Sequence, residues 1–244
     1  MSGHSKWATI HRAKEIKDAK KGAIFTKMGA NIVVAVRSGG GIGDPEKNFR
    51  LRLVIDKARQ FNMPKENIAR AIEKGMGTGE GINLTEVMYE GFLPGGCAVL
   101  VEALTDNRAR TSQKVRSALE AGGGTMASLG AVSYMFSLCE EIRFRALDVS
   151  LKDISSQELE LIDLGIDDFE NEGEFLVIYC HKEKTEQIKN GLEKLGYSID
   201  SADVVMKPIT YVEISDEQTR SKIEKIIEEL EDLDDVTKVY SNYA

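Results

Sequence analysis

Few residues in this sequence could form covalent cross-links or bind a metal ion. The 244 residues include three cysteines and three histidines. Cys97, Cys139 and Cys180 are odd in number, lie far apart and form no C-x-x-C pair, so neither a disulfide framework nor a zinc cluster is indicated. No two histidines have the i, i+4 spacing of a helical metal site. Scattered thiols are typical of a reducing cytoplasm, so we expect a cytoplasmic protein without a bound metal.

Long apolar runs are also missing. The longest, residues 28–36, is nine residues long, whereas a helix needs about 20 apolar residues to cross a bilayer. No apolar core follows the basic N-terminal residues, as it would in a secretory signal. Glu15 and Asp18 are acidic, and Arg12 is the only arginine near them, which is unlike a mitochondrial transit peptide. We therefore expect neither membrane association nor a targeting segment.

The sequence patterns that carry common catalytic chemistry are absent. There is no G-x-S-x-G and no G-x-x-x-x-G-K-[ST]. The dinucleotide pattern G-x-G-x-x-G fails because Gly41 is followed three residues later by Asp44, and Gly77 by Glu80. The glycine clusters are better explained as turns and linkers. We expect a protein without a cofactor or catalytic residues, although a catalytic site assembled only by the fold would leave no such pattern.

What the sequence does contain is an uneven distribution of charge. The net charge is −8. Residues 1–80 hold 16 basic and 8 acidic residues, a balance of +8, whereas residues 81–244 hold 16 basic and 32 acidic residues, a balance of −16. Such asymmetry indicates that one end of a chain binds nucleic acid while the other faces solvent or a partner. A lysine-rich helical surface without a ligand is the alternative.

The spacing of apolar residues predicts helices in the first third. Apolar residues recur at helical spacing between residues 24 and 36, and the glycines at 39–43 should end this helix. Pro45 predicts either a turn or the first position of a second helix. A third helix should run from Pro64 to a C-terminal stop at Gly75. These helices predict a small bundle.

After residue 81 the pattern changes to alternating strands and helices. Segments 140–206 have the order β-α-β-β-α-β, which is ferredoxin-like. We therefore expect an α+β fold, in which a helical N-terminal domain (1–78) precedes a split α/β domain (82–136 plus 208–244) with a ferredoxin-like α/β domain (137–207) inserted in it. The expected strands are 88–92, 97–104, 131–136, 142–147, 174–180, 204–214 and 236–243, and the expected helices are 107–121, 157–164, 184–195 and one that a capping box starts at Ser215.

The basic N-terminal segment (residues 1–21) is the first candidate site. Lys14, Lys17 and Lys21 would share one helix face, which could follow a phosphate backbone. Trp7 offers a flat surface on which an unpaired base could stack, or it anchors the segment to the helical bundle. The other cations of this segment are Lys6, Arg12 and Lys20.

A second candidate site is the helix expected from residue 107, with Thr105 or Asp106 as its N-cap. Its cations are Arg108, Arg110, Lys114 and Arg116, with no acidic residue before Glu120. Cations in the first turn oppose the helix dipole at a typical cost of about 0.3–1 kcal/mol each, which suggests that they face an anion. Alternatively, they pair with acidic neighbours such as Glu90 or Glu102.

Several ordered motifs together resemble the YebC family. They are GHSKW, DAKKGAIFTK, the GGG…DP…NFRLR segment, NMPKENIARAIEKG, YEGFLPGGCAVLVE and TDNRARTSQKVR, which extend from residue 2 to about Phe136. The resemblance implies three domains, a helical one and two α/β domains, and no catalytic residues. It also implies leader contacts at His4, Ser5, Lys6, Trp7 and the lysines from Lys17 to Lys21. At Ile10-His11-Arg12-Ala13-Lys14 the sequence departs from many relatives, which puts leader contacts there in doubt.

The resemblance also implies a function. The family is described as DNA-binding transcriptional regulators, and some members resemble ribosome-associated translation factors, including a mitochondrial activator of cytochrome oxidase subunit one. We therefore expect a non-enzymatic regulator of gene expression that binds promoter DNA or ribosomal RNA, with the ribosome as a possible partner. The alternative is a protein-interaction adaptor whose basic N-terminal region binds an acidic protein.

Overall fold

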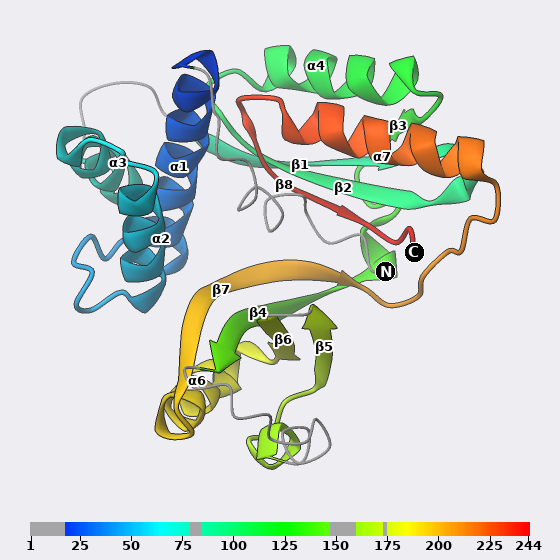
Figure 1. Ribbon diagram of the computed structural model, residues 1–244. Helices are drawn as coiled ribbons and strands as arrows, with labels where there is room; N and C mark the ends of the chain where they lie inside the picture. Colours follow the sequence, from blue (N-terminus) through cyan, green and yellow to red (C-terminus); the bar gives the residue numbers. More distant parts are fainter. Residues whose placement is uncertain (1–17, 79–83, 147–159, 173–174) are drawn as a thin grey trace.

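The computed structural model describes residues 18–78, 84–146, 160–172 and 175–244. These residues form a helical region and two four-stranded antiparallel sheets (Figure 1). The predicted α+β class, with helices first and two sheets after them, is confirmed.

The helical region contains α1 (Asp18–Ser38), α2 (Phe49–Gln60) and α3 (Lys65–Met76). Its core contains Met28, Ile32 and Val36, the apolar positions whose spacing predicted α1. The helix ends at the predicted glycines, because Gly40 and Gly41 adopt positive φ angles.

Of the two alternatives predicted for Pro45, the turn is confirmed, and α2 begins only after Asn48, whose side chain accepts a hydrogen bond from the Leu51 amide. The predicted end of the third helix is wrong. Helix α3 does not stop at Gly75, which packs against Val36 so closely that a Cβ atom would lie 2.6 Å from that side chain. Gly77, with φ 73°, is the left-handed C-terminal residue instead.

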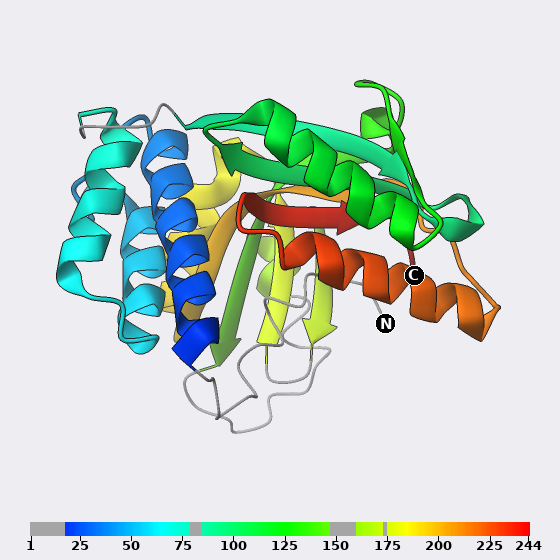
Figure 2. The ribbon, with the colours of Figure 1, turned by 90° about the horizontal axis from the view of Figure 1, so that it is seen from above.

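The first sheet has the strand order β3-β1-β2-β8. It contains β1 (Thr85–Phe92), β2 (Ala98–Thr105), β3 (Thr125–Ala127) and β8 (Val236–Ser241). Helices α4 (Arg108–Ala121) and α7 (Glu217–Glu231) lie side by side over one face (Figure 2). Between these helices and the sheet, Val101, Leu119 and Ile226 belong to one fully buried apolar core.

The second sheet has the order β5-β6-β4-β7 and follows β3 in the chain. It contains β4 (Phe136–Ala146), β5 (Asp168–Glu172), β6 (Phe175–Cys180) and β7 (Tyr197–Pro208). Residues 160–163 and α6 (Thr185–Lys194) cover one face, where Leu161, Ile188 and Leu192 are buried. The order and the antiparallel pairing are those of a ferredoxin-like fold, as predicted. The chain then returns to the first sheet through α7 and β8 (Figure 1).

Several predicted strands are displaced. Residues 131–136 are not a strand: they form a loop and a short helical turn, and β4 begins only at Phe136. The predicted strand 204–214 begins earlier, after Gly196, and ends at Pro208, which has no amide to continue the ladder. The edge strands β3 and β5 were missed, because three residues are too short for a pattern and β5 reads DFENE, which is acidic.

The predicted N-caps are each displaced along the chain. Asn107, not Thr105 or Asp106, caps α4, and its side chain accepts a hydrogen bond from the Arg110 amide at 3.0 Å. Asp216, not Ser215, caps α7, and its carboxylate accepts from the Thr219 amide at 2.9 Å. A sequence with several adjacent capping residue types leaves the choice to the direction from which the chain enters the helix.

Two buried charged contacts join the helical region to the sheets. The Lys27 ammonium of α1 donates to the backbone carbonyls of Glu231, Leu233 (3.0 Å) and Val236 (3.3 Å), where α7 ends and β8 begins. The Arg50 guanidinium of α2 pairs with the Glu140 carboxylate of β4. The sequence analysis predicted neither contact, because each joins residues 90 or more positions apart.

Candidate nucleic-acid interface

Most of the predicted N-terminal contacts lie outside the described residues. This group contains His4, Ser5, Lys6, Trp7, Arg12, Lys14 and Lys17. Lys20 and Lys21 lie in the first turn of α1. Of the two candidate sites, the structure therefore describes mainly the second, the start of α4.

Polar contacts fix the start of α4. The Asn107 amide donates to the Thr105 hydroxyl at 2.9 Å. The Thr111 hydroxyl lies 2.8 Å from that same oxygen and 2.7 Å from the Asp235 carboxylate. Asp235 belongs to the turn between α7 and β8, so a residue about 125 positions away holds this helix end. The first turn is therefore a rigid support for the side chains that it carries.

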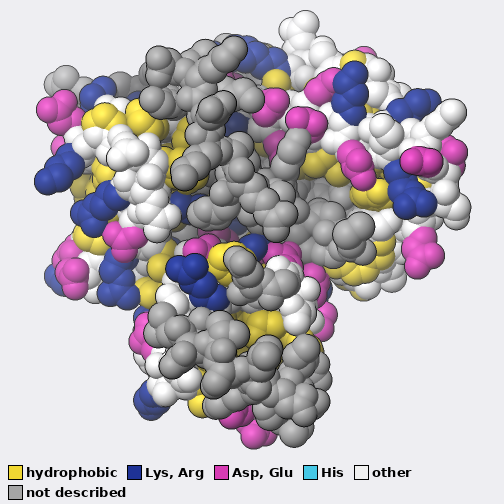
Figure 3. All heavy atoms as spheres, viewed as in Figure 1, with side chains coloured by type: hydrophobic (Ala, Val, Ile, Leu, Met, Phe, Trp, Pro, Cys, Tyr) yellow, Lys and Arg dark blue, Asp and Glu magenta, His cyan; other side chains and the backbone are white. Residues whose placement is uncertain are grey.

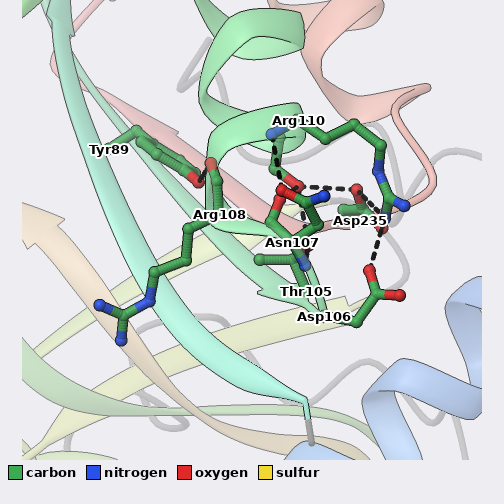
Figure 4. Close-up of polar contacts among 8 residues, drawn as sticks. Tyr89, Thr105, Asp106, Asn107, Arg108, Arg110 and Asp235 are labelled. Carbon is green, nitrogen blue, oxygen red and sulfur yellow. Dashed lines mark hydrogen bonds and ion pairs between the residues drawn. The ribbon is translucent and has the colours of Figure 1, made fainter. Parts of the chain in front are cut away.

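Arg110 is paired with carboxylates inside the molecule. Its guanidinium lies 2.7 Å from the Asp106 carboxylate and 3.2 Å from that of Asp235 (Figure 4). The hydrogen bond to Asp235, with the nearby negative charge of Asp235 and Asp106, raises the pKa of Arg110. Pairing with acidic residues is thus the observed state, but the expected partners, Glu90 and Glu102, were wrong.

Arg108 differs from Arg110. Its backbone carbonyl accepts a hydrogen bond from the Tyr89 hydroxyl at 3.1 Å, while its side chain points away from the Asp106 and Asp235 carboxylates (Figure 4). Within the described part of the chain, the exposed guanidinium of Arg108 has neither an ion-pair nor a hydrogen-bond partner. Of the two arginines in the first turn of this helix, Arg108 is therefore the one available to an external anion.

The remaining cations of α4 do not form one surface with Arg108. Arg110 and Lys114 border a shallow groove between α4 and α7, which Glu229 and Asp232 also border. Arg116 lies 3.9 Å from Glu120, one helical turn away, in an exposed pair of little energetic weight. The predicted set of four cations is thus divided between an acidic groove and the outer surface.

Charged side chains of both signs are interspersed over the helical region and the first sheet (Figure 3). On α3, Lys65 and Lys74 are exposed and have no carboxylate partner among the residues that the structure describes. The sequence analysis counted them in the basic balance of residues 1–80 but did not single them out. The feature that singles out these two lysines is that neither has an ion pair among the described residues, and the sequence does not reveal this.

A cavity of about 580 Å³ lies where α1, α2 and the two sheets meet. Two ion pairs lie in its lining: Arg143 lies 2.6 Å from Glu172, and Lys238 lies 3.6 Å from Asp203. Burial raises the pKa of Glu102, against the opposing charge of Lys238. These pairs support the junction between the sheets and do not resemble an acid–base pair poised for catalysis.

Neither the thiols nor the acidic residues suggest a reactive centre. Cys97 and Cys180 are buried and Cys139 is partly buried, and burial raises the pKa of each thiol, to about 11 for Cys139 and Cys180. Among the described residues, no group of three or more His, Cys, Asp or Glu is arranged to hold a metal ion. Nor does any helix described here have the length and hydropathy of a membrane span.

The two arginines of the first turn should respond differently to charge reversal. Arg110→Glu would place a third carboxylate beside Asp106 and Asp235, so we expect a lower melting temperature. Arg108→Glu breaks no ion pair and suits the helix dipole, so the melting temperature should stay the same or rise slightly. Thermal unfolding of the two single variants measures this difference, and equal changes would contradict the assigned pairing.

The sequence of this chain matches models of a known protein family. Residues 5–78 match a family model described as the TACO1/YebC protein N-terminal domain, and residues 84–243 match one described as the TACO1/YebC second and third domain. The chain belongs to the TACO1/YebC family. The family resemblance predicted from the sequence motifs is confirmed.

Curated members of the TACO1/YebC family are similar along their full length. A "probable transcriptional regulatory protein" of Chloroflexus aggregans is 46% identical over 244 residues, covering 99% of this chain and 95% of the relative. One of the same description from Aquifex aeolicus is 44% identical, covering 100% and 96%. The crystal structure of a conserved hypothetical protein from Aquifex aeolicus superposes with a TM-score of 0.83 at 42% identity, covering 98% of this chain and 97% of that one.

Proposed function

We propose that this TACO1/YebC family protein is a non-enzymatic regulator of gene expression that binds nucleic acid through its basic N-terminal segment, assisted by Arg108. The observation that carries the proposal is the full-length similarity to relatives named probable transcriptional regulatory proteins. The charge balance of +8 in residues 1–80 supports a nucleic acid as the ligand.

The geometry of α4 supports an accessory role for Arg108 only. Because Arg110 is held by Asp106 and Asp235, it would lose those partners to reach a phosphate. Arg108 has no such partner among the described residues and extends from a helix start that Asn107 and Thr111 hold rigid. The fixed helix start sets where this side chain leaves the backbone, so no backbone has to be ordered when the guanidinium binds. The predicted contacts at Lys114 and Arg116 stay a prediction.

The type of nucleic acid follows from the acidic part of the chain. Residues 81–244 have a balance of −16, which a bare duplex would repel. This favours a structured RNA site, such as one on the ribosome, over promoter DNA. A translational role within the cytoplasm is our finer proposal, and a transcriptional role is the form suggested by the names of the relatives.

An adaptor that binds an acidic protein through its basic end is the competing function. Both functions use the same cations, so weaker binding after charge removal does not separate them. Competition does: excess RNA should displace the natural ligand if that ligand is a nucleic acid, and should leave an acidic protein partner bound unless RNA occupies the same surface.

Removal of residues 2–21 should weaken nucleic-acid binding strongly while leaving the unfolding of the sheets nearly unchanged. If the segment neutralises about five phosphates, log K for the intact chain should fall with log salt at a slope of roughly −4. Titration of labelled ribosomal RNA and duplex DNA at several salt concentrations measures affinity and slope for both ligands.

A matched control removes positive charge from the acidic part. Replacing the exposed Lys182, Lys194 and Lys222 by glutamine lowers the charge by three without touching the N-terminal segment. Binding should then change little. An affinity of the intact chain that does not depend on salt would refute the electrostatic mechanism.

A further inference from the structure

The four most exposed large apolar side chains of the described residues lie on the segments by which the chain passes between the two sheets. Leu129 is 83% exposed and Tyr134 72%, both in the loop between β3 and β4. Leu138, near the start of β4, is 66% exposed, and Ile209, just after β7, is 62% exposed. The Ile209 amide donates to the Met135 carbonyl at 2.9 Å, so these segments lie side by side. We call these four residues the apolar patch.

The backbone segments that carry the apolar patch contain no charge. Residues 121–139 include no Asp, Glu, Lys or Arg, and neither do residues 208–212, in a chain of which 30% is charged. A phosphate backbone would therefore find no cation on these segments, so nucleic acid is a poor occupant. Exposed apolar clusters of this kind are typical of protein interaction sites.

A buried carboxylate holds the loop that displays Leu129 and Tyr134. Glu90 of β1 is 2% exposed, and its carboxylate accepts hydrogen bonds from the amides of Gly130 (2.7 Å), Val132 (2.7 Å) and Ser133 (3.0 Å). Burial alone would raise the pKa of Glu90, but these amides outweigh it and hold the pKa below its usual value. The loop is thus fixed before any partner binds, which lowers the entropy lost on binding.

Near the apolar patch the surface becomes acidic. Tyr211 follows Ile209 by two residues, and burial, together with the carboxylates of Glu170 and Asp168, raises the pKa of its hydroxyl. Lys207, which pairs with both carboxylates, is only 13% exposed, whereas Asp168 is 60% exposed and Glu213 is also exposed, so the acidic groups dominate this surface. An apolar centre with an acidic border complements a surface of the opposite charge.

We propose that the apolar patch is the docking site of a separate, positively charged protein that presents apolar side chains of its own. A second copy of this chain is disfavoured because each copy carries a net charge of −8, so two copies repel each other. This site is separate from the basic N-terminal segment and from Arg108, so it does not depend on the proposed binding of nucleic acid.

Photo-crosslinking in living cells that make the full chain identifies the occupant. A benzoylphenylalanine at position 134 should form adducts with a protein of net positive charge, which mass spectrometry of the adduct identifies. The same group at position 162 is the control, because Ile162 is also exposed but lies on the second sheet's helical side, away from the apolar patch. It should not give that adduct.

Binding of the purified chain to the protein so identified then tests the surface itself. Leu129→Ser together with Tyr134→Ser should weaken binding at least tenfold, whereas Ile162→Ser should not change it. Leu129 and Tyr134 are exposed and contribute little to the core. The melting temperature of the double serine variant should therefore equal that of the parent, which would show that the variant folds. Glu90→Gln keeps the apolar side chains but loosens the loop, and should weaken binding by a smaller factor.

Several outcomes would overturn the proposal. Adducts at position 134 with a second copy of this chain, with nucleic acid or with an acidic protein would each show that the partner is not the positively charged protein proposed here. No adduct specific to position 134, or equal binding by the double serine variant, would remove the site. The double variant should still bind ribosomal RNA like the parent, so failure here and failure of the proposed function are distinguishable.

Discussion

Lys27→Met should destabilise the protein by about 3 kcal/mol, as measured by urea denaturation. Lys27 is buried, and its ammonium donates to three backbone carbonyls at the end of α7 and the start of β8. Methionine fills similar volume but cannot donate, so carbonyls buried with the ammonium lose their partner. Hydrogen bonds to a charged group are typically worth about 1.5–3 kcal/mol, and unsatisfied buried groups cost a similar amount.

The location of Lys27 explains why the effect should be large. Burial lowers its pKa, while the carboxylates of Asp232, Glu231 and Asp234 oppose that shift and favour the charged form. A cation also suits the negative end of the α7 dipole. Lys65→Met on exposed α3 is the matched control and should change stability by less than about 0.5 kcal/mol. Equal effects at the two positions would show that the ammonium contacts do not hold α1 to the first sheet.

Glu140→Ala should have an effect at least as large, with a cost of about 3–5 kcal/mol, because it leaves the Arg50 guanidinium in a nearly buried position without its partner. The carboxylate of Glu140 is 1% exposed. Its second oxygen, Oε1, has no hydrogen-bond partner among the described residues. A pair desolvated this fully is sensitive to the loss of either member.

A double-mutant cycle separates the ion pair from simple packing. Arg50→Met with Glu140→Leu replaces both charges by apolar groups, beside Phe49 and Leu53, which already pack against the second sheet. This variant should recover most of the stability lost by Glu140→Ala, since no charge stays buried alone. Costs of the two single changes that simply add in the double variant would mean that the side chains do not interact. Urea unfolding of the parent, Arg50→Met, Glu140→Leu and the double variant supplies the cycle.

Local patterns predicted most of the elements correctly. The spacing of Met28, Ile32 and Val36 predicted α1, and the alternation of elements in residues 140–206 predicted a ferredoxin-like sheet. Both signals depend on neighbours a few residues apart, where backbone geometry alone sets which side chains share a face. The loop at 131–135 was mistaken for a strand because its apolar composition is strand-like, whereas hydrogen bonds that its amides donate to the Glu90 carboxylate hold it in another shape. The domain boundaries stay a prediction.

The candidate site has features that local sequence patterns do not predict. The sequence by itself determined that the chain has a basic start and an acidic remainder, that α4 begins with arginines, and that the motifs are those of the TACO1/YebC family. Only the tertiary structure decided that Asp235 pairs with Arg110, whereas Arg108 has no partner among the described residues. It also decided that Lys27 binds the carbonyls at the end of α7, and that Leu129 and Tyr134 lie on the surface. The reason is physical: charge and periodicity are properties of a segment. The partner of a side chain depends on which distant segments pack together.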